Sequence, residues 1–205
     1  MKRLLIWAGP VISSKSTRAL GYAKRLRIAG NRVVLVRPAV SIRQHESPGN
    51  LVTRGGDAWP SVDLQRARDI VGHPKVEAAN VLWVDEPNLW DDEADLFDIL
   101  QRARKTHMIM VSGCPATSEL EPFGTSFPKL MAVADDIHWC KADCHYTNTM
   151  ESASRSVCLV KKVGQRLVGG AESYSPASPE AWTRLQQERL GLSLKAEELA
   201  QHDRG

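Results

Sequence analysis

The sequence has no long hydrophobic run, few cysteines and little net charge, and each of these shortages excludes a class of protein. No apolar stretch approaches the roughly 20 residues that a membrane-spanning helix needs. The four cysteines lack the regular, paired spacing of a disulfide-stapled domain. The formal net charge is only +3, and the basic residues are scattered rather than gathered in one stripe. We therefore expect neither a membrane partner nor a nucleic-acid partner.

The N-terminus also lacks the features of a secretory signal. Met1-Lys2-Arg3 leads into only a few apolar residues, which end at Gly9-Pro10, too short a run for a signal peptide. Together with the missing disulfide framework, this favours a cytoplasmic protein.

What the chain does contain is enough apolar sequence for a sizeable core, 42% of 205 residues. Short aliphatic and β-branched runs predict buried strands at Leu4–Trp7, Arg32–Val36, Val81–Val84 and His107–Val111. Helical patterns occupy Ser16–Ala29 and Asp91–Thr106, and Ser41–Pro60 reads as a loop or ribbon. Strands alternating with helices predict an α/β fold with a mostly parallel sheet and helices on both faces.

The pattern changes after about residue 138. Cys140–Tyr174 is polar and β-branched with glycine turn signals, which predicts a small β-rich subdomain. Ser175–Pro179 reads as a linker, and a polar helix is predicted from Glu180 to about Ala200. We therefore predict three parts: an α/β domain at 1–138, a small subdomain at 139–175 and a helical tail at 176–205.

The stretch Gly9 to Thr17, GPVISSKST, follows the first predicted strand and opens the first predicted helix. It resembles a phosphate-binding loop of pattern G-x-x-x-x-G-K-[ST], in which backbone N–H groups surround the phosphates and the lysine neutralises their charge. Ser14 stands where the second glycine belongs. The alternative is an ordinary Gly-Pro turn before a helix, with Ser13 or Ser14 as the N-cap.

A second motif favours the nucleotide interpretation. Asp85-Glu86 directly follows the strand Val81–Val84, at the carboxyl end where open α/β sheets bind their ligands. One carboxylate there can hold Mg²⁺ and the other can act on a nucleophile. The alternative is an acidic pair that merely begins a loop.

Six segments in order resemble the type II thymidine kinases, the P-loop deoxynucleoside kinases with a flexible lasso loop. They are Gly9–Thr17, Ala29–Arg43 with Pro38-Ala39, Thr53–Gly56, Asp85–Asn88, Glu121–Gly124 with Leu130, and Leu167–Tyr174. The resemblance runs from about Leu4 to Tyr174 and implies a RecA-like P-loop fold with a small β-rich lasso subdomain. It also implies transfer of the γ-phosphate of ATP, with Mg²⁺, to the 5′-hydroxyl of thymidine or deoxyuridine, by a homodimer or homotetramer.

The same resemblance assigns roles to individual residues. Glu86 would take the proton from the 5′-hydroxyl, and Ser16 with Asp85 would position Mg²⁺. The nucleotide would be bound by Gly9, Pro10, Val11, Ile12, Ser13, Ser14, Lys15, Ser16, Arg43, Asp85 and Asn88. The acceptor nucleoside would be bound by Phe123, Gln165, Leu167, Val168, Gly169 and Tyr174.

Several positions depart from the family pattern. Ser14 replaces the loop glycine, Ser41 an aspartate and Arg54 a histidine, while Pro115 and Ser118 alter the acceptor pocket. These changes leave two alternatives open: a kinase for a different or modified nucleoside, or a catalytically weakened pseudokinase that serves as a nucleotide-binding module. Trp7 and Trp83 are expected in the core, and Trp90 is the one tryptophan considered near a substrate.

The family's structural zinc site uses two C-x-x-C pairs, and this chain keeps only Cys144 of the first pair. Four tetrahedral ligands cannot be assembled in the family's way. A rearranged set of Cys140, Cys144, His145 and Cys158 is the alternative, but we expect buried thiols and no zinc. The small subdomain would then rest on packing, of Trp139, Tyr146 and Trp182 for example.

Overall fold

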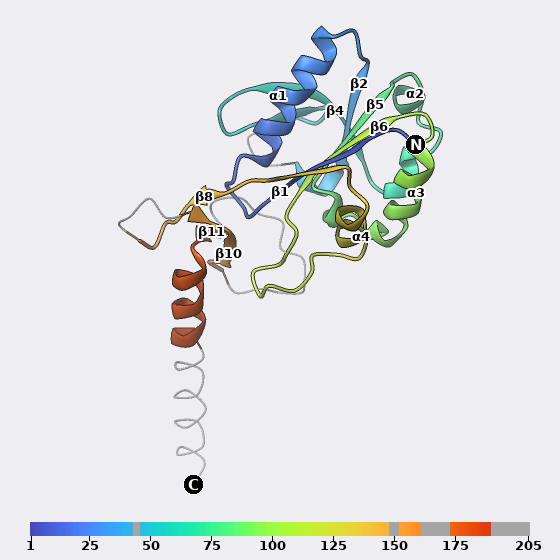
Figure 1. The fold of residues 1–205 in the computed structure, drawn as a ribbon. Coiled ribbons are helices and arrows are strands. Elements are labelled where there is room, and N and C mark those ends of the chain that lie inside the picture. Colours follow the sequence, from blue (N-terminus) through green and yellow to red (C-terminus); the bar gives the residue numbers. More distant parts are fainter. Residues whose placement is uncertain (43–45, 148–151, 161–172, 190–205) are drawn as a thin grey trace.

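The computed structural model describes residues 1–42, 46–147, 152–160 and 173–189. Within them, seven strands form one sheet in the order β3-β4-β2-β5-β6-β1-β7 (Figure 1). The strands are β1 (Leu4–Ala8), β2 (Val33–Pro38), β3 (Asn50–Val52), β4 (Ala58–Leu64), β5 (Val81–Asp85), β6 (Met108–Gly113) and β7 (Asp136–Trp139). All neighbours pair in parallel except β3, which is antiparallel to β4. The predicted α/β fold with a mostly parallel sheet is confirmed.

Helices and short 3-10 turns cover both faces of this sheet. They are α1 (Lys15–Ile28), η1 (Ala39–Ser41), η2 (Ala67–Ile70), α2 (Pro74–Glu77), η3 (Pro87–Leu89), η4 (Glu93–Asp95), α3 (Leu96–Ala103) and α4 (Ser126–Ala132). In Figure 1 α1 lies on one side of the sheet, and α3 and α4 lie on the other. The open edge at β7 pairs only with β1 among the described strands.

Side-chain alternation along the strands divides the core in two. In β1, Leu4 and Ile6 join the core under α3 and α4, while Leu5 and Trp7 join the core under α1. In β5, Trp83 belongs to the α1 side. Both cores are fully buried, as the unbroken apolar runs predict.

Three strands of the sheet, β3, β4 and β7, were not among the four predicted strands. The Ser41–Pro60 segment does contain a ribbon, but its second strand, β4, continues to Leu64 and pairs in parallel with β2. Short β7 was missed because its side chains are mostly exposed and give no apolar signal.

The helix predicted at Asp91–Thr106 begins later, at Leu96. Two acidic residues at the start of the predicted helix, Asp92 and Glu93, make hydrogen bonds to other segments instead. Asp92 accepts hydrogen bonds from the Ala67 and Arg68 N–H groups, and buried Glu93 accepts from the backbone N–H groups of Thr125 and Ser126 at the start of α4. Tertiary hydrogen bonds therefore override the local helical pattern.

Trp90 is a core residue. Its side chain is buried, packs in the cluster under α3, and donates from Nε1 to the Leu64 carbonyl at 3.0 Å. The idea that it lies near a substrate is wrong.

Beyond the sheet, two small antiparallel hairpins and a helix follow. They are β8 (Ala142–Asp143) with β9 (Ser152–Ala153), β10 (Arg155–Cys158) with β11 (Tyr174–Ala177), and helical residues 179–189. We call these three elements together the hairpin module; it lies at the lower left of Figure 1. The predicted linker at Ser175–Pro179 is wrong over its first residues, because β11 pairs with β10 there.

The hairpin module has its own small apolar cluster of Cys144, Ala153, Val157, Ala177 and Ala181, with partly buried Tyr146 and Trp182 packed against it. Trp139, also expected to contribute, is exposed instead. The predicted helical tail is present through residue 189, and its remainder lies outside the described residues. No helix in the described ranges is long and apolar enough to cross a membrane.

Candidate functional site

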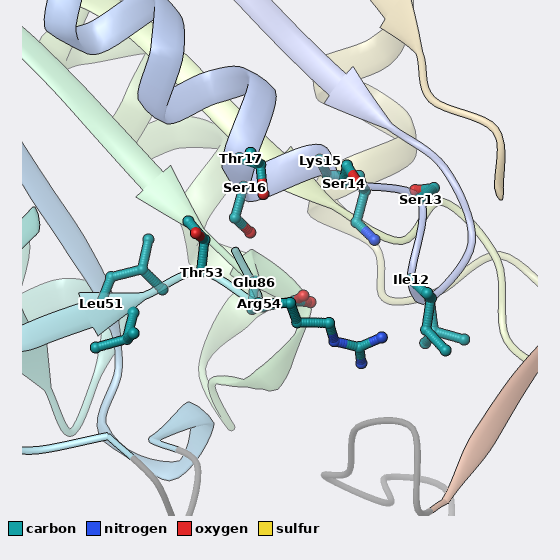
Figure 2. Close-up of a pocket in the computed structure, with 12 residues that line it drawn as sticks. Ile12, Ser13, Ser14, Lys15, Ser16, Thr17, Leu51, Thr53, Arg54 and Glu86 are labelled. Atoms are coloured by element: carbon teal, nitrogen blue, oxygen red, sulfur yellow. The ribbon is translucent and has the colours of Figure 1, made fainter. Parts of the chain in front are cut away.

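A cavity of about 260 Å³ lies at the carboxyl edge of the sheet, where β1 and β5 end (Figure 2). It is lined by residues 11–17 of the loop after β1, by residues 51–54 of the β3–β4 ribbon, and by Glu86. Cavities that bury a whole drug-sized ligand usually measure about 300–1,000 Å³. This one therefore suits a phosphate chain better than a complete nucleotide.

The loop between β1 and α1 has the backbone of an anion-binding loop. Ser14, which stands in place of the expected glycine, adopts φ 59° and ψ 26°, in the left-handed region. Ile12 is also left-handed, with φ 64°. A side chain in this region costs roughly 1–2 kcal/mol, so the loop keeps a glycine-like shape at the expense of strain.

Gly9, at the start of the loop, is required for a packing reason. A Cβ built there would lie 2.1 Å from the Cys140 carbonyl oxygen and 2.7 Å from Ser13 Oγ. The backbone just after β7 thus crosses close under the loop. Further along, the Val11 N–H donates to Ser156 Oγ in β10 at 3.1 Å. Two contacts therefore join the loop to the later part of the chain.

Lys15 is buried at the first position of α1, and its Nζ donates to the Pro10 carbonyl at 2.7 Å. Burial alone lowers the pKa of Lys15, but ionised Cys114, Glu86 and Asp85 outweigh that effect and raise it. Burial also raises the pKa of the Cys114 thiol. Lys15 is thus a buried cation close to Asp85 and Glu86.

Asp85 is the centre of a buried hydrogen-bonded chain. Alternation places Asp85 and Ser112 on the α1 face of neighbouring strands, where they are Cα partners in the β5–β6 register. Ser112 Oγ and, at 2.9 Å, Ser16 Oγ donate to Asp85 Oδ1, and Trp83 Nε1 donates to Ser112 Oγ at 2.8 Å. The carboxylate beside the loop is thus fixed from both sides.

Glu86 reaches the cavity because the backbone leaves the extended strand conformation at that residue. Continued alternation would place its side chain on the opposite face from Asp85. Instead Glu86 adopts the left-handed conformation, φ 50° and ψ 53°, just before Pro87, and its side chain lines the cavity. Non-glycine residues in this conformation cluster at functional sites. The geometry supports a reactive role for this carboxylate.

Ser16 and Asp85 suit a magnesium ion. A serine hydroxyl 2.9 Å from a buried carboxylate supplies hard oxygen donors, and Mg²⁺ in phosphate sites usually takes few protein ligands and completes its shell with water and phosphate oxygens. Within the described residues no group of three or more His, Cys, Asp or Glu could hold a metal by itself. The pair fits a shared site completed by a phosphate ligand.

Of the residues predicted for the acceptor, the structure describes Phe123 and Tyr174. Burial, with Cys158, Cys114 and Glu119 nearby, raises the pKa of Tyr174 to about 12, so its hydroxyl stays protonated. Tyr174 and Lys15 are therefore both close enough to Cys114 for its charge to affect their pKa values. Phe123 is partly buried in the loop before α4 and does not line the cavity.

Asn88 is buried beneath the site and donates to the Cys114 carbonyl at 2.7 Å, while its Oδ1 has no hydrogen-bond partner in the part of the chain that the structure describes. Five predicted site residues, Arg43, Gln165, Leu167, Val168 and Gly169, lie outside the described residues.

The four cysteines are all buried and unpaired with one another. Cys144 Sγ accepts the Ser178 N–H at 3.1 Å. Burial would raise the pKa of Cys144, but hydrogen bonds from the Ser178 and Tyr146 backbone lower it below its usual value. The other conceivable zinc ligand of this turn, His145, has Nδ1 3.1 Å from Ser175 Oγ. The absence of zinc stays a prediction.

The structure thus brings Lys15, Ser16 and Glu86 to one cavity, with Asp85 hydrogen-bonded to Ser16 at its edge. It also shows participants that were not predicted: Trp83 and Ser112 behind Asp85, Cys114 beside Lys15, and Thr53 with Arg54 on the opposite wall. The available signals were slight: Ser112 is a polar residue that ends an apolar strand, and Arg54 replaces a family histidine.

Comparison with known protein families shows that the family described as thymidine kinase matches residues 2–182. This range includes the whole sheet, the phosphate-binding loop and the hairpin module up to Trp182.

Proposed function

Because the chain belongs to the thymidine kinase family, we propose that it transfers the γ-phosphate of ATP to the 5′-hydroxyl of thymidine or a related pyrimidine deoxynucleoside. Nucleoside kinase activity in general follows from the family; the donor and the acceptor are the proposal. The observation that carries it is the single cavity shared by Lys15, Ser16 and Glu86, with Asp85 bonded to Ser16.

The residues divide into those that hold the donor and one that acts on the acceptor. Lys15 and the N–H groups of residues 12–16 would bind the β- and γ-phosphates at the N-terminus of α1. Lys15 would exchange its present bond to the Pro10 carbonyl for a phosphate oxygen. Ser16 and Asp85 would hold Mg²⁺, which supplies charge neutralisation across the phosphates.

Glu86 would act on the acceptor. Its carboxylate would accept the proton of the 5′-hydroxyl while that oxygen approaches the γ-phosphorus. Since phosphoryl transfer depends mainly on an oriented nucleophile and on neutralised charge, the left-handed backbone that aims Glu86 into the cavity is the relevant preparation. Tyr174 would lie beside the acceptor nucleoside, with its hydroxyl protonated and uncharged.

The test is transfer of radiolabelled phosphate from Mg·ATP to a panel of nucleosides, with Glu86→Gln as the matched control. We expect transfer to a pyrimidine deoxynucleoside by the wild type and a loss of about 10²–10⁴-fold in Glu86→Gln. Transfer only to another nucleoside would replace the acceptor in the proposal. Mg·ATP binding without transfer to any acceptor would favour a nucleotide-binding pseudokinase.

Two further parts of the proposal concern assembly and location. We propose a homodimer or homotetramer, to be checked by light scattering on the purified chain, and a cytoplasmic location, to be checked by fractionation. We also propose that no structural zinc is bound, and a metal analysis of the purified protein would check this.

A further inference from the structure

The cavity has a second wall that faces the phosphate-binding loop. Residues 51–54, at the end of β3 and the start of its turn, lie across from Ser14, Lys15 and Ser16 (Figure 2). Neither Thr53 nor Arg54 has a place in the mechanism so far. Both carry groups that can bind an anion: a hydroxyl and a guanidinium.

Thr53 carries a buried polar atom without a partner. The residue is 4% exposed, and its Oγ1 makes no hydrogen bond within residues 1–42, 46–147, 152–160 and 173–189. Its backbone is satisfied, because Thr53 N–H donates to the Asp57 carbonyl at 2.8 Å and its own carbonyl accepts from Gly56 at 2.9 Å. A buried hydroxyl is normally hydrogen-bonded, so an orphan in a cavity wall indicates a ligand atom.

Arg54 brings a positive charge to the same wall. Its side chain lines the cavity with Lys15 and Glu86, and Figure 2 shows it extending from beside Glu86 toward Ile12. A guanidinium matches the oxygens of a phosphate in a bidentate geometry that an ammonium cannot reproduce. With Lys15 opposite, the cavity presents a cation on each of two walls.

This wall is fixed to the body of the protein before any ligand binds. Buried Arg37 on β2 pairs with Glu46 at 2.5 Å and with Asp63 at 2.8 Å, and it donates to the Asn50 carbonyl at 2.9 Å. At the other end of the turn, Lys24 on α1 pairs with Asp57. The turn is thereby held to β2, β4 and α1, so that binding requires little reorganisation.

We propose that Thr53 Oγ1 and the Arg54 guanidinium bind the terminal phosphate of the nucleoside triphosphate, on the side opposite to Lys15. This inference rests on the proposed function and adds a subsite to it. In the transfer, the bond from the γ-phosphorus to the bridging oxygen breaks, a bond to the acceptor oxygen forms, and the acceptor's proton passes to Glu86. Arg54 takes part in no bond change and only balances the charge on the phosphoryl oxygens.

The experiment compares two nucleotides that differ by the terminal phosphate. Binding of Mg·ADP and of the non-hydrolysable Mg·AMP-PNP is measured by calorimetry for wild type, Arg54→Gln, Arg54→Lys and Thr53→Val. We expect Arg54→Gln to weaken Mg·AMP-PNP about tenfold and Mg·ADP less than twofold. Arg54→Lys should recover part of the difference, and Thr53→Val should show a smaller loss with the same selectivity.

Arg102→Gln is the control, because Arg102 is an exposed arginine on α3, on the other face of the sheet. It should bind both nucleotides as the wild type does. An equal loss of both nucleotides in Arg54→Gln, or no loss of either, would overturn the subsite. If the wild type itself bound neither nucleotide, the proposed function would fall, and the two failures are therefore distinguishable.

Discussion

The phosphate-binding end of the sheet and the hairpin module are built in different ways. We use "phosphate-binding end" for residues 9–17 with Asp85, Glu86 and Ser112. That end stands on strands between two large cores, and buried Asp85 accepts hydrogen bonds from Ser112 and Ser16. The hairpin module has strands of two to four residues and a cluster of five buried side chains. Its polar contacts include the hydrogen bond from the Ser178 N–H to Cys144 Sγ. If the proposed function holds, changes in the first region should reduce phosphoryl transfer, whereas changes in the hairpin module should mainly reduce stability.

The largest expected effect comes from Lys15→Met, which keeps the side-chain length and removes the charge. We expect turnover to fall about 10²–10³-fold, because one preorganised charge facing the phosphates is lost. The melting temperature should stay close to that of the wild type, so that the variant loses rate and not stability. Steady-state kinetics beside thermal denaturation would check this, and a variant that retained full turnover would contradict the contrast between the regions.

Ser112→Ala should disturb the phosphate-binding end from behind. It removes a donor to Asp85 and leaves the buried Trp83 N–H without its acceptor, at a cost of about 1–3 kcal/mol in the free energy of unfolding. We also expect a several-fold rise in the Mg²⁺ concentration for half-maximal activity. Trp83→Phe removes the other partner, so the double variant should be less destabilised than the sum of the two single variants. Strict additivity would argue against the chain of hydrogen bonds.

Cys144→Ala tests the hairpin module. Loss of a buried thiol that accepts the Ser178 N–H should lower the free energy of unfolding by about 1–2 kcal/mol. Mg·ATP affinity should stay within about twofold of wild type, since Cys144 does not line the cavity. Cys140→Ala also removes a buried thiol, but one beside the phosphate-binding loop, and is the matched variant for comparison. Stoichiometric zinc in the purified protein, released when Cys144 is replaced, would show that the module is built on a metal after all.

Ser14→Gly should have the smallest effect and has the opposite sign. Glycine relieves the left-handed strain at φ 59° but gains more entropy in the unfolded chain, so the net gain should be at most about 1 kcal/mol. Ser14→Ala keeps a Cβ and should give no such gain. Chemical denaturation of both variants separates the backbone effect from the hydroxyl, and a loss of stability in Ser14→Gly would mean that the serine side chain itself stabilises the loop.

The sequence predicts the proposed catalytic cluster better than its surroundings. Lys15, Ser16, Asp85 and Glu86 could be located because each stands at the end of an apolar strand or the start of a helix, where chain position alone determines the edge of the sheet. The supporting contacts of Ser112 and Trp83 depend on the β5–β6 register, which no local pattern reveals. Thr53 and Arg54 lie in the turn between β3 and β4, and the pairing of β4 with β2, which joins this ribbon to the sheet, was not predicted.

The two contacts made by the phosphate-binding loop also bear on how the protein is made. The loop lies near the N-terminus, yet its base packs on the Cys140 carbonyl and its Val11 N–H is held by Ser156, 145 positions later. A ribosome adds roughly 5–20 residues per second, so the loop leaves the exit tunnel many seconds before these partners exist. The nascent chain therefore completes the contacts of this loop only after Ser156 has been added, and a product truncated before Cys140 would lack both of them.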